Sequence, residues 1–159
     1  MDYQQRKQAH LLLWWNVKVL CGLLLIVAMF VRFLADWFAP LFTVPNSIPV
    51  ALVVAGGSVF LYHYYLIKRQ NQLLDHADHL VTKGGLFRYV RHPMYLGDIL
   101  MFTGFTLLAP SLATLSILAL AVYALVRQAI AEDRYLSQLH KTQHGSWIKS
   151  TKLLFPTVF

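Results

Sequence analysis

Two short polar stretches in an otherwise apolar chain hold the residues that could do chemistry. In the first stretch, Arg91 and His92 stand directly before Pro93 and an apolar segment. Charged residues set against such a segment are costly, and they usually serve a function. Pro93 suits the first turn of a helix, where free backbone N–H groups attract an anion. We therefore expect a binding site at this join. The alternative is a basic belt that only attracts anionic lipid.

The second polar stretch contains Glu132 and Asp133, and it follows two further apolar segments. If those segments form a hairpin, the chain returns to the side that it left. The acidic pair can then face Arg91 and His92 across one interfacial cleft, so that acid and base meet outside the lipid. A solvated helix face is the alternative interpretation of this charge run.

Membrane helices must position both stretches. The 159 residues are 57% apolar and 13% charged, whereas soluble domains have about 45–50% and about 25%. A soluble globular protein is therefore excluded. Because about 20 residues cross a bilayer, the apolar blocks predict spans over about residues 11–34, 48–67, 94–109 and 112–126. The last two are short, so we predict a tight hairpin whose arms are short or extend into their polar flanks.

The predicted fold class is an all-α integral membrane protein. Residues 1–159 are predicted to form one domain with about four transmembrane helices and a C-terminal helical hairpin. We interpret Gly56 and Gly57 as a close helix contact, because a phosphate cradle would follow a strand.

The distribution of charge predicts the orientation. Of the fourteen Lys and Arg residues, thirteen fall in the N-terminal region, the middle loop and the tail, and Arg32 falls on the other side. Both termini are therefore predicted to be cytoplasmic, in the inner or cell membrane if the source is bacterial. The net charge of +7 lies between apolar blocks, so we expect membrane lipids as partners and no nucleic acid.

Cysteine and histidine give no basis for a metal site. Cys21 is the one cysteine and lies in the first apolar block, where we interpret it as a small buried residue. His76 and His79 are only three apart in a loop, and we interpret no pair among the seven histidines, with its nearby acids, as a zinc site. No metal is therefore expected.

Several motifs in order carry a family resemblance. They are Leu80-Val81-Thr82 with Phe87, then Arg91-His92-Pro93-Met94-Tyr95, then Glu132-Asp133-Arg134 with Leu136, and a closing Leu154-Phe155-Pro156. Together they resemble the isoprenylcysteine carboxyl methyltransferase family and its bacterial and archaeal relatives, over about residues 78–156. The resemblance implies a membrane methyltransferase that uses S-adenosylmethionine, held in a cytosolic pocket made by about residues 70–95 and 127–156.

The resemblance also implies the roles of individual residues. Arg127 would contact the substrate in catalysis, although a gapless register puts the family arginine on Gln128. The chain departs from the family at Leu86 and Phe87, which replace proline and tyrosine, and in the tail at His140-Lys141, His144 and Trp147. The cofactor-binding residues would be Asn71, Asp78, His79, Leu80, Val81, Phe87, Arg91, His92, Pro93, Met94, Tyr95 and Glu132.

The chemistry of methyl transfer fits these residue types. Displacement at a sulfonium needs no metal, and alignment in a dry site supplies much of the acceleration. Arg91 and His92 suit the cofactor carboxylate, Glu132 its positive or hydroxyl groups, and Phe87 or Tyr95 its ring. The acceptor would be a small lipophilic molecule that enters from the bilayer, and thiol, carboxylate and amine acceptors all stay open.

Two other functions compete with methyl transfer. Tyr95-Leu96-Gly97-Asp98 resembles a segment of membrane sterol reductases, which bind NADPH, but the Arg91-His92-Pro93 triplet and the absence of arginines for a 2′-phosphate argue against a reductase. A non-enzymatic scaffold or small transporter is the other alternative. Its best support is Asp98, a lone acid inside a span.

Overall fold

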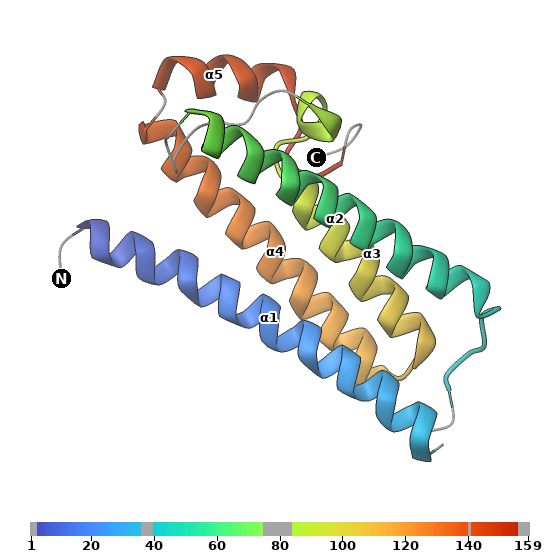
Figure 1. Ribbon diagram of the computed structural model, residues 1–159. Coiled ribbons are helices and arrows are strands. Elements are labelled where there is room, and N and C mark those ends of the chain that lie inside the picture. Colours follow the sequence, from blue (N-terminus) through green and yellow to red (C-terminus); the bar gives the residue numbers. More distant parts are fainter. Residues whose placement is uncertain (1–2, 36–39, 75–83, 140, 156–159) are drawn as a thin grey trace.

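A computed structural model describes residues 3–35, 40–74, 84–139 and 141–155. Four long helices lie side by side in a bundle, and a short fifth helix crosses one end of it (Figure 1). No β-strand occurs in the ranges described. In chain order the elements are α1 (Tyr3–Ala35), α2 (Ser47–Leu74), the 3₁₀ helix η1 (Gly85–Arg88), α3 (Pro93–Leu108), α4 (Leu112–Leu139) and α5 (Lys141–Ser150).

Three of the helices are long and apolar enough to cross a membrane. The qualifying segments are Leu12–Leu34, Ser47–Gln70 and Leu112–Gln138. The fourth apolar helix, α3, has 16 residues and so spans about 24 Å, less than the hydrocarbon core of about 30 Å. The predicted all-α membrane fold is confirmed: the described ranges contain three helices of membrane-spanning length and one shorter apolar helix. Large apolar side chains exposed on α1, such as Leu23, Val27 and Phe30, suit contact with lipid.

The hairpin of α3 and α4 forms where the sequence predicts it, and α4 extends into its polar flank as far as Leu139. The turn is closed by reciprocal capping. Thr114 Oγ1 accepts a hydrogen bond from the Ser111 backbone N–H at 2.9 Å, and Ser111 Oγ accepts one from the Thr114 N–H at 3.2 Å. The N–H of Leu41 donates to the Pro110 carbonyl at 2.9 Å, which ties the α1–α2 connection to this turn.

Glycines bring α2 and α3 into backbone contact. A Cβ on Gly56 would lie 2.6 Å from the Gly97 carbonyl oxygen, and a Cβ on Gly97 would lie 2.7 Å from the Gly56 oxygen. Neither position has room for a side chain. The predicted close contact is therefore confirmed at Gly56. At Gly57 the nearest atom is the Met101 sulfur at 3.7 Å, an ordinary distance that does not require glycine.

The apolar core joins α1, α3 and α4 to the tail. It includes Cys21 and Leu25 of α1, Phe102 of α3, Leu125 of α4 and Leu154 of the tail. Cys21 is buried, as expected. The tail is thus part of the packed body. It lies at the end of the bundle where η1 and α5 also lie, which we call the polar end (Figure 1).

Candidate functional site

The loop before α3 is held against α2 by a histidine. Gly84 and Gly85 have φ angles of 98° and 50°, a left-handed backbone that favours glycine. A Cβ on Gly85 would lie 2.5 Å from His63 Nε2. That nitrogen accepts a hydrogen bond from the Leu86 N–H at 2.9 Å, while Nδ1 lies 2.6 Å from the Val59 carbonyl and therefore carries the proton.

Phe87 packs into a small cluster between this loop and α5. Its ring meets that of His63 edge to face at 5.4 Å, and its carbonyl accepts a hydrogen bond from Trp147 Nε1 at 3.1 Å. Phe87 and Trp147 are both buried, with Leu66 and Leu136 packed against them. The position predicted to bind the cofactor thus also anchors α5.

The tail pairs with the loop through backbone atoms. The Lys152 N–H donates to the Tyr89 carbonyl at 2.9 Å, and the Lys152 carbonyl accepts from the Arg91 N–H at 2.8 Å. The His92 N–H donates to the Leu153 carbonyl at 3.2 Å. This parallel bridge fixes the backbone of Arg91 and His92, the two basic residues of the predicted site.

The acidic and basic residues lie together at this end of the hairpin, as predicted. Arg91 Nε donates to Asp133 Oδ2 at 2.8 Å, and Arg91 Nη1 donates to the Thr151 carbonyl at 2.7 Å. His92 Nε2 lies 3.1 Å from Asp133 Oδ1. Asp133 therefore binds two basic side chains at once, and it holds the loop against α4.

Glu132 occupies a different position from its neighbour. Tyr95 OH donates to Glu132 Oε2 at 2.7 Å, and His92 Nδ1 lies 3.5 Å from the same oxygen. The rings of His92 and Tyr95 stack at 5.3 Å with an interplanar angle of 7°. The Glu132 side chain is 39% exposed and that of Asp133 only 13%, so Glu132 is the carboxylate that a ligand can reach.

We call these five residues, Arg91, His92, Tyr95, Glu132 and Asp133, the acid–base cluster. Pro93 is buried at the first turn of α3, and Met94 is half-buried. Asn71 lies in the last turn of α2, and the structure describes only the backbone of this residue. Asp78, His79, Leu80 and Val81 lie outside the described residues.

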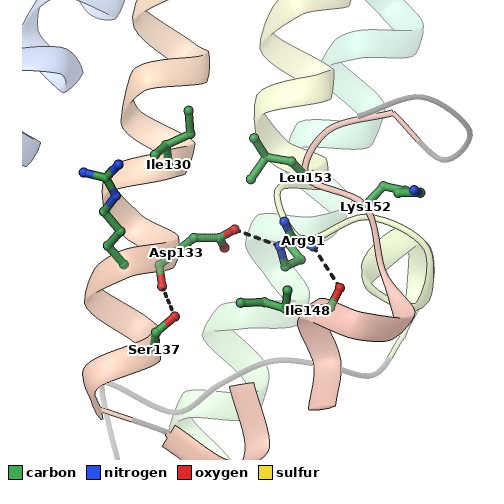
Figure 2. Close-up of a pocket in the computed structure, with 8 residues that line it drawn as sticks. Arg91, Ile130, Asp133, Ser137, Ile148, Lys152 and Leu153 are labelled. Carbon is green, nitrogen blue, oxygen red and sulfur yellow. Dashed lines mark hydrogen bonds and ion pairs between the residues drawn. The ribbon is translucent and has the colours of Figure 1, made fainter. Parts of the chain in front are cut away.

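A pocket of about 410 Å³ opens beside the cluster. Figure 2 shows Arg91 and Asp133 reaching toward each other across it, from the loop and from α4, with Ile148 of α5 below them. Small-molecule pockets have about 300–1,000 Å³, so a cofactor-sized ligand fits. Residues of the loop, α4, α5 and the tail line it. Its lining residues are Arg91, Ile130, Asp133, Arg134, Ser137, Ile148, Lys152 and Leu153.

The charge of the pocket favours an anionic group. Arg91, Arg134 and Lys152 outnumber Asp133, and Ile130 and Leu153 provide apolar walls. Of the cofactor residues predicted from sequence, Arg91 lines this pocket, while His92, Tyr95 and Glu132 stand beside it in the acid–base cluster.

Gln128 has a buried oxygen without a partner. The residue is 7% exposed, and its Oε1 atom makes no hydrogen bond to any residue that the structure describes. An unmet buried acceptor costs about 1–3 kcal/mol. Gln128 lies one helical turn from Glu132 on the same face of α4.

Arg127 is placed differently from the rest of the predicted site. It is exposed, and its guanidinium lies 5.7 Å from the centre of the Trp14 ring in α1. Five residues of helix rotate its direction by about 140° from that of Glu132. The structure does not bring Arg127 to the acid–base cluster, and its role stays a prediction.

Sequence reasoning missed two features of this region. It did not separate Asp133, which binds Arg91 and His92, from Glu132. It also did not pair Lys18 of α1 with Asp98 of α3, whose Nζ and Oδ2 atoms lie 3.0 Å apart. The signal for this pair in the sequence was that one apolar block contains a basic residue and another contains an acidic residue.

Among the described residues, no group of three His, Cys, Asp or Glu side chains could hold a metal ion.

Comparison with known proteins gives relatives of two kinds. The 3-oxo-5-alpha-steroid 4-dehydrogenase 2 of Macaca fascicularis is 29% identical over 110 residues, which are 69% of this chain and 41% of that protein. The protein of the same name from Sus scrofa is 26% identical over 125 residues, 79% of this chain and 46% of that protein. An uncharacterized protein of Schizosaccharomyces pombe is 40% identical over 59 residues, 36% of this chain and 20% of that protein.

The chain spans less than half the length of these curated relatives. No solved structure matches it. The phospholipid methyltransferase family matches residues 46–143, from the start of α2 through the loop, the hairpin and the acidic pair. That match covers more than half of the chain, so the protein belongs to the phospholipid methyltransferase family.

Proposed function

We propose that this membrane methyltransferase uses S-adenosylmethionine and methylates a lipophilic acceptor at the polar end of its bundle. The observation that carries the proposal is the half-exposed Glu132 carboxylate, held by Tyr95 beside a basic pocket of about 410 Å³. Family membership supports methyl transfer. The cofactor is inferred from the fit of these residues to its groups.

The described residues fit the cofactor group by group. S-adenosylmethionine carries one carboxylate, which suits the side of the pocket with Arg91, Arg134 and Lys152. Its ammonium, hydroxyl and adenine amino groups are donors. The accessible Glu132 carboxylate is an acceptor for such a group. Bound in this way, the cofactor would supply an electrophilic methyl group on a sulfonium.

The protein's contribution is alignment and exclusion of water. Asp133 and the Thr151 carbonyl hold Arg91 in place before any ligand arrives, so little reorganisation is needed on binding. Leu153, Ile130 and Ile148 form an apolar wall of the pocket, and a cofactor and acceptor packed against it would shield the reacting groups from water. The acceptor would enter sideways from the bilayer, with its thiol, carboxylate or amine directed to the polar end.

The direct test is equilibrium binding to detergent-purified protein. We expect labelled S-adenosylmethionine to bind and NADPH not to bind. Binding of NADPH alone would instead favour a reductase. Binding of neither ligand would favour a scaffold or transporter.

The reductase remains the second candidate because specific observations favour it. Two relatives are named 3-oxo-5-alpha-steroid 4-dehydrogenase 2, and Tyr95-Leu96-Gly97-Asp98 lies at the start of α3. In this chain Asp98 is paired with Lys18, so it is already neutralised. The same pair weakens the case for a transporter, since Asp98 is not a lone acid in the span.

We also propose that the polar end faces the cytoplasm. The N-terminal end of α1 lies at the same end of the bundle as η1 and α5 (Figure 1), so the basic segments share one side. After replacement of Cys21 by Ser, a cysteine introduced at Gly84 should resist impermeant thiol reagents in sealed cells, and one at Pro45 should react. Labelling at position 84 from outside would refute this orientation.

A further inference from the structure

A buried ion pair joins α1 to α3 inside the apolar part of the bundle. Lys18 lies within the membrane-length segment Leu12–Leu34, and its Nζ atom is 3.0 Å from Asp98 Oδ2. Both residues are at most 9% exposed. Ionisable residues at such depth are costly and usually serve a function. Helix packing alone does not require them, because apolar contacts of Cys21 and Leu25 with Phe102 already join α1 to α3 in the core.

The ammonium group of Lys18 also contacts the ring of Tyr95. Nζ lies 4.9 Å from the ring centre, within the range of a cation–π interaction. Tyr95 and Asp98 are three residues apart on α3 and share one face of that helix. One ammonium group therefore binds both the carboxylate and the aromatic ring.

Tyr95 transmits this contact to the acid–base cluster. Its hydroxyl donates to Glu132 Oε2 at 2.7 Å, and its ring stacks on His92. A tyrosine can hold a carboxylate in one place only if its own ring is held. Stacking on His92 constrains the ring from the loop side, and Lys18 constrains it from α1.

We infer that Lys18 is a positioning residue for Glu132 and acts through Tyr95, with Asp98 holding the ammonium group in place. This inference deepens the proposed function, because Glu132 is the residue proposed to bind the cofactor. It gives α1, which lies outside the matched residues 46–143, a part in the site. Removal of the ammonium group would release the Tyr95 ring and, with it, Glu132.

The first test needs no cofactor. Detergent-purified protein is treated with dicyclohexylcarbodiimide, and modification of Glu132 is followed by mass spectrometry. We expect Lys18→Met to raise the rate of modification at least about threefold, Tyr95→Phe to raise it by a similar factor, and the double variant to exceed neither. Additive effects of the two substitutions would overturn the inference.

Folding of the variants is controlled separately. Lys18→Met leaves Asp98 unpaired, so the variant Lys18→Met/Asp98→Leu replaces the whole ion pair with apolar groups, which stability usually tolerates. It should fold and still show fast modification of Glu132. Lys18→Arg keeps the charge and should restore most of the protection. Wild-type protection of Glu132 in the folded Lys18→Met/Asp98→Leu variant would overturn the inference.

The second test uses labelled S-adenosylmethionine. Lys18→Met/Asp98→Leu should raise its dissociation constant about tenfold, whereas Leu25→Ala, an apolar core change two helical turns beyond Lys18 in α1, should lower thermal stability and leave the constant unchanged. An equal weakening in both variants would reduce Lys18 to a packing role and overturn the inference. If the wild type does not bind the cofactor but the modification pattern holds, the proposed function fails and the positioning role stands.

Discussion

The two sides of α3 are held by different means. Toward α2, backbone meets backbone at Gly56 and Gly97, with no space for side chains. Toward α1 and α4, α3 presents Phe102 to the apolar core together with the polar side chains of Asp98 and Tyr95, which bind Lys18 and Glu132. Backbone shape fixes one side, whereas side-chain packing and polar contacts fix the other. The difference shows how a short helix can be both a rigid support and the carrier of a polar site.

The largest effect should follow from loss of Glu132. We expect Glu132→Ala to abolish binding of S-adenosylmethionine and to leave the melting temperature in detergent nearly unchanged, because the side chain is 39% exposed and outside the apolar core. Equilibrium binding and a thermal melt measure the two quantities. Ser116→Ala, an exposed change near the other end of α4, is the control. Unchanged affinity in Glu132→Ala would remove the carboxylate from the site.

The glycine side should respond in the opposite way. Gly56→Ala should destabilise the protein by about 1–3 kcal/mol, because its methyl group has no space against α3. The affinity of the molecules that stay folded should not change. Gly57→Ala is a matched control one residue away, where the nearest atom is 3.7 Å distant. Equal melting temperatures for the two variants would contradict the close contact.

Loss of His92 tests whether the polar residues at the start of α3 only bind ligand or also stabilise the fold. His92→Ala should weaken cofactor binding by about 1–3 kcal/mol, the value of a hydrogen bond to a charged group. His92 is also the N-cap residue of α3, although its side chain makes no capping bond. A large loss of stability with normal affinity would make it a structural residue.

The smallest effect on cofactor binding should come from Arg127. Its guanidinium lies over Trp14, away from the acid–base cluster, so Arg127→Ala should leave the dissociation constant for S-adenosylmethionine nearly the same. Turnover should fall or the acceptor KM should rise. Transfer of labelled methyl groups to a membrane lipid extract measures this. Gln128→Ala belongs in the same experiment, and full turnover in both variants would place the acceptor elsewhere.

The sequence predicts those parts of the site that depend on chain direction. A hairpin returns to the side it left, and for this reason Glu132 and Asp133 meet Arg91 and His92. The sequence could not predict the contacts that depend on how each helix is rotated about its axis. Lys18 and Asp98 are 80 residues apart, and predicting their contact requires knowledge of which face of α1 is directed toward α3. The division of roles between Glu132 and Asp133 likewise depends on about 100° of rotation per residue.

The bonds between tail and loop could not be predicted for a different reason. They join backbone atoms of Tyr89, Arg91 and His92 to those of Lys152 and Leu153, and a backbone hydrogen bond leaves no mark on residue type. The motif Leu154-Phe155-Pro156 indicated that the tail belongs to the site without showing how.

The same bridge sets an order of assembly. During synthesis, residues 89–92 leave the ribosome about sixty residues before their partners at 152–153. Throughout that interval the loop lacks the three backbone hydrogen bonds that join Tyr89, Arg91 and His92 to the tail. These bonds can form only after α5 has been made. Synthesis of the α3–α4 hairpin and fixing of the loop beside it are therefore separate steps in time.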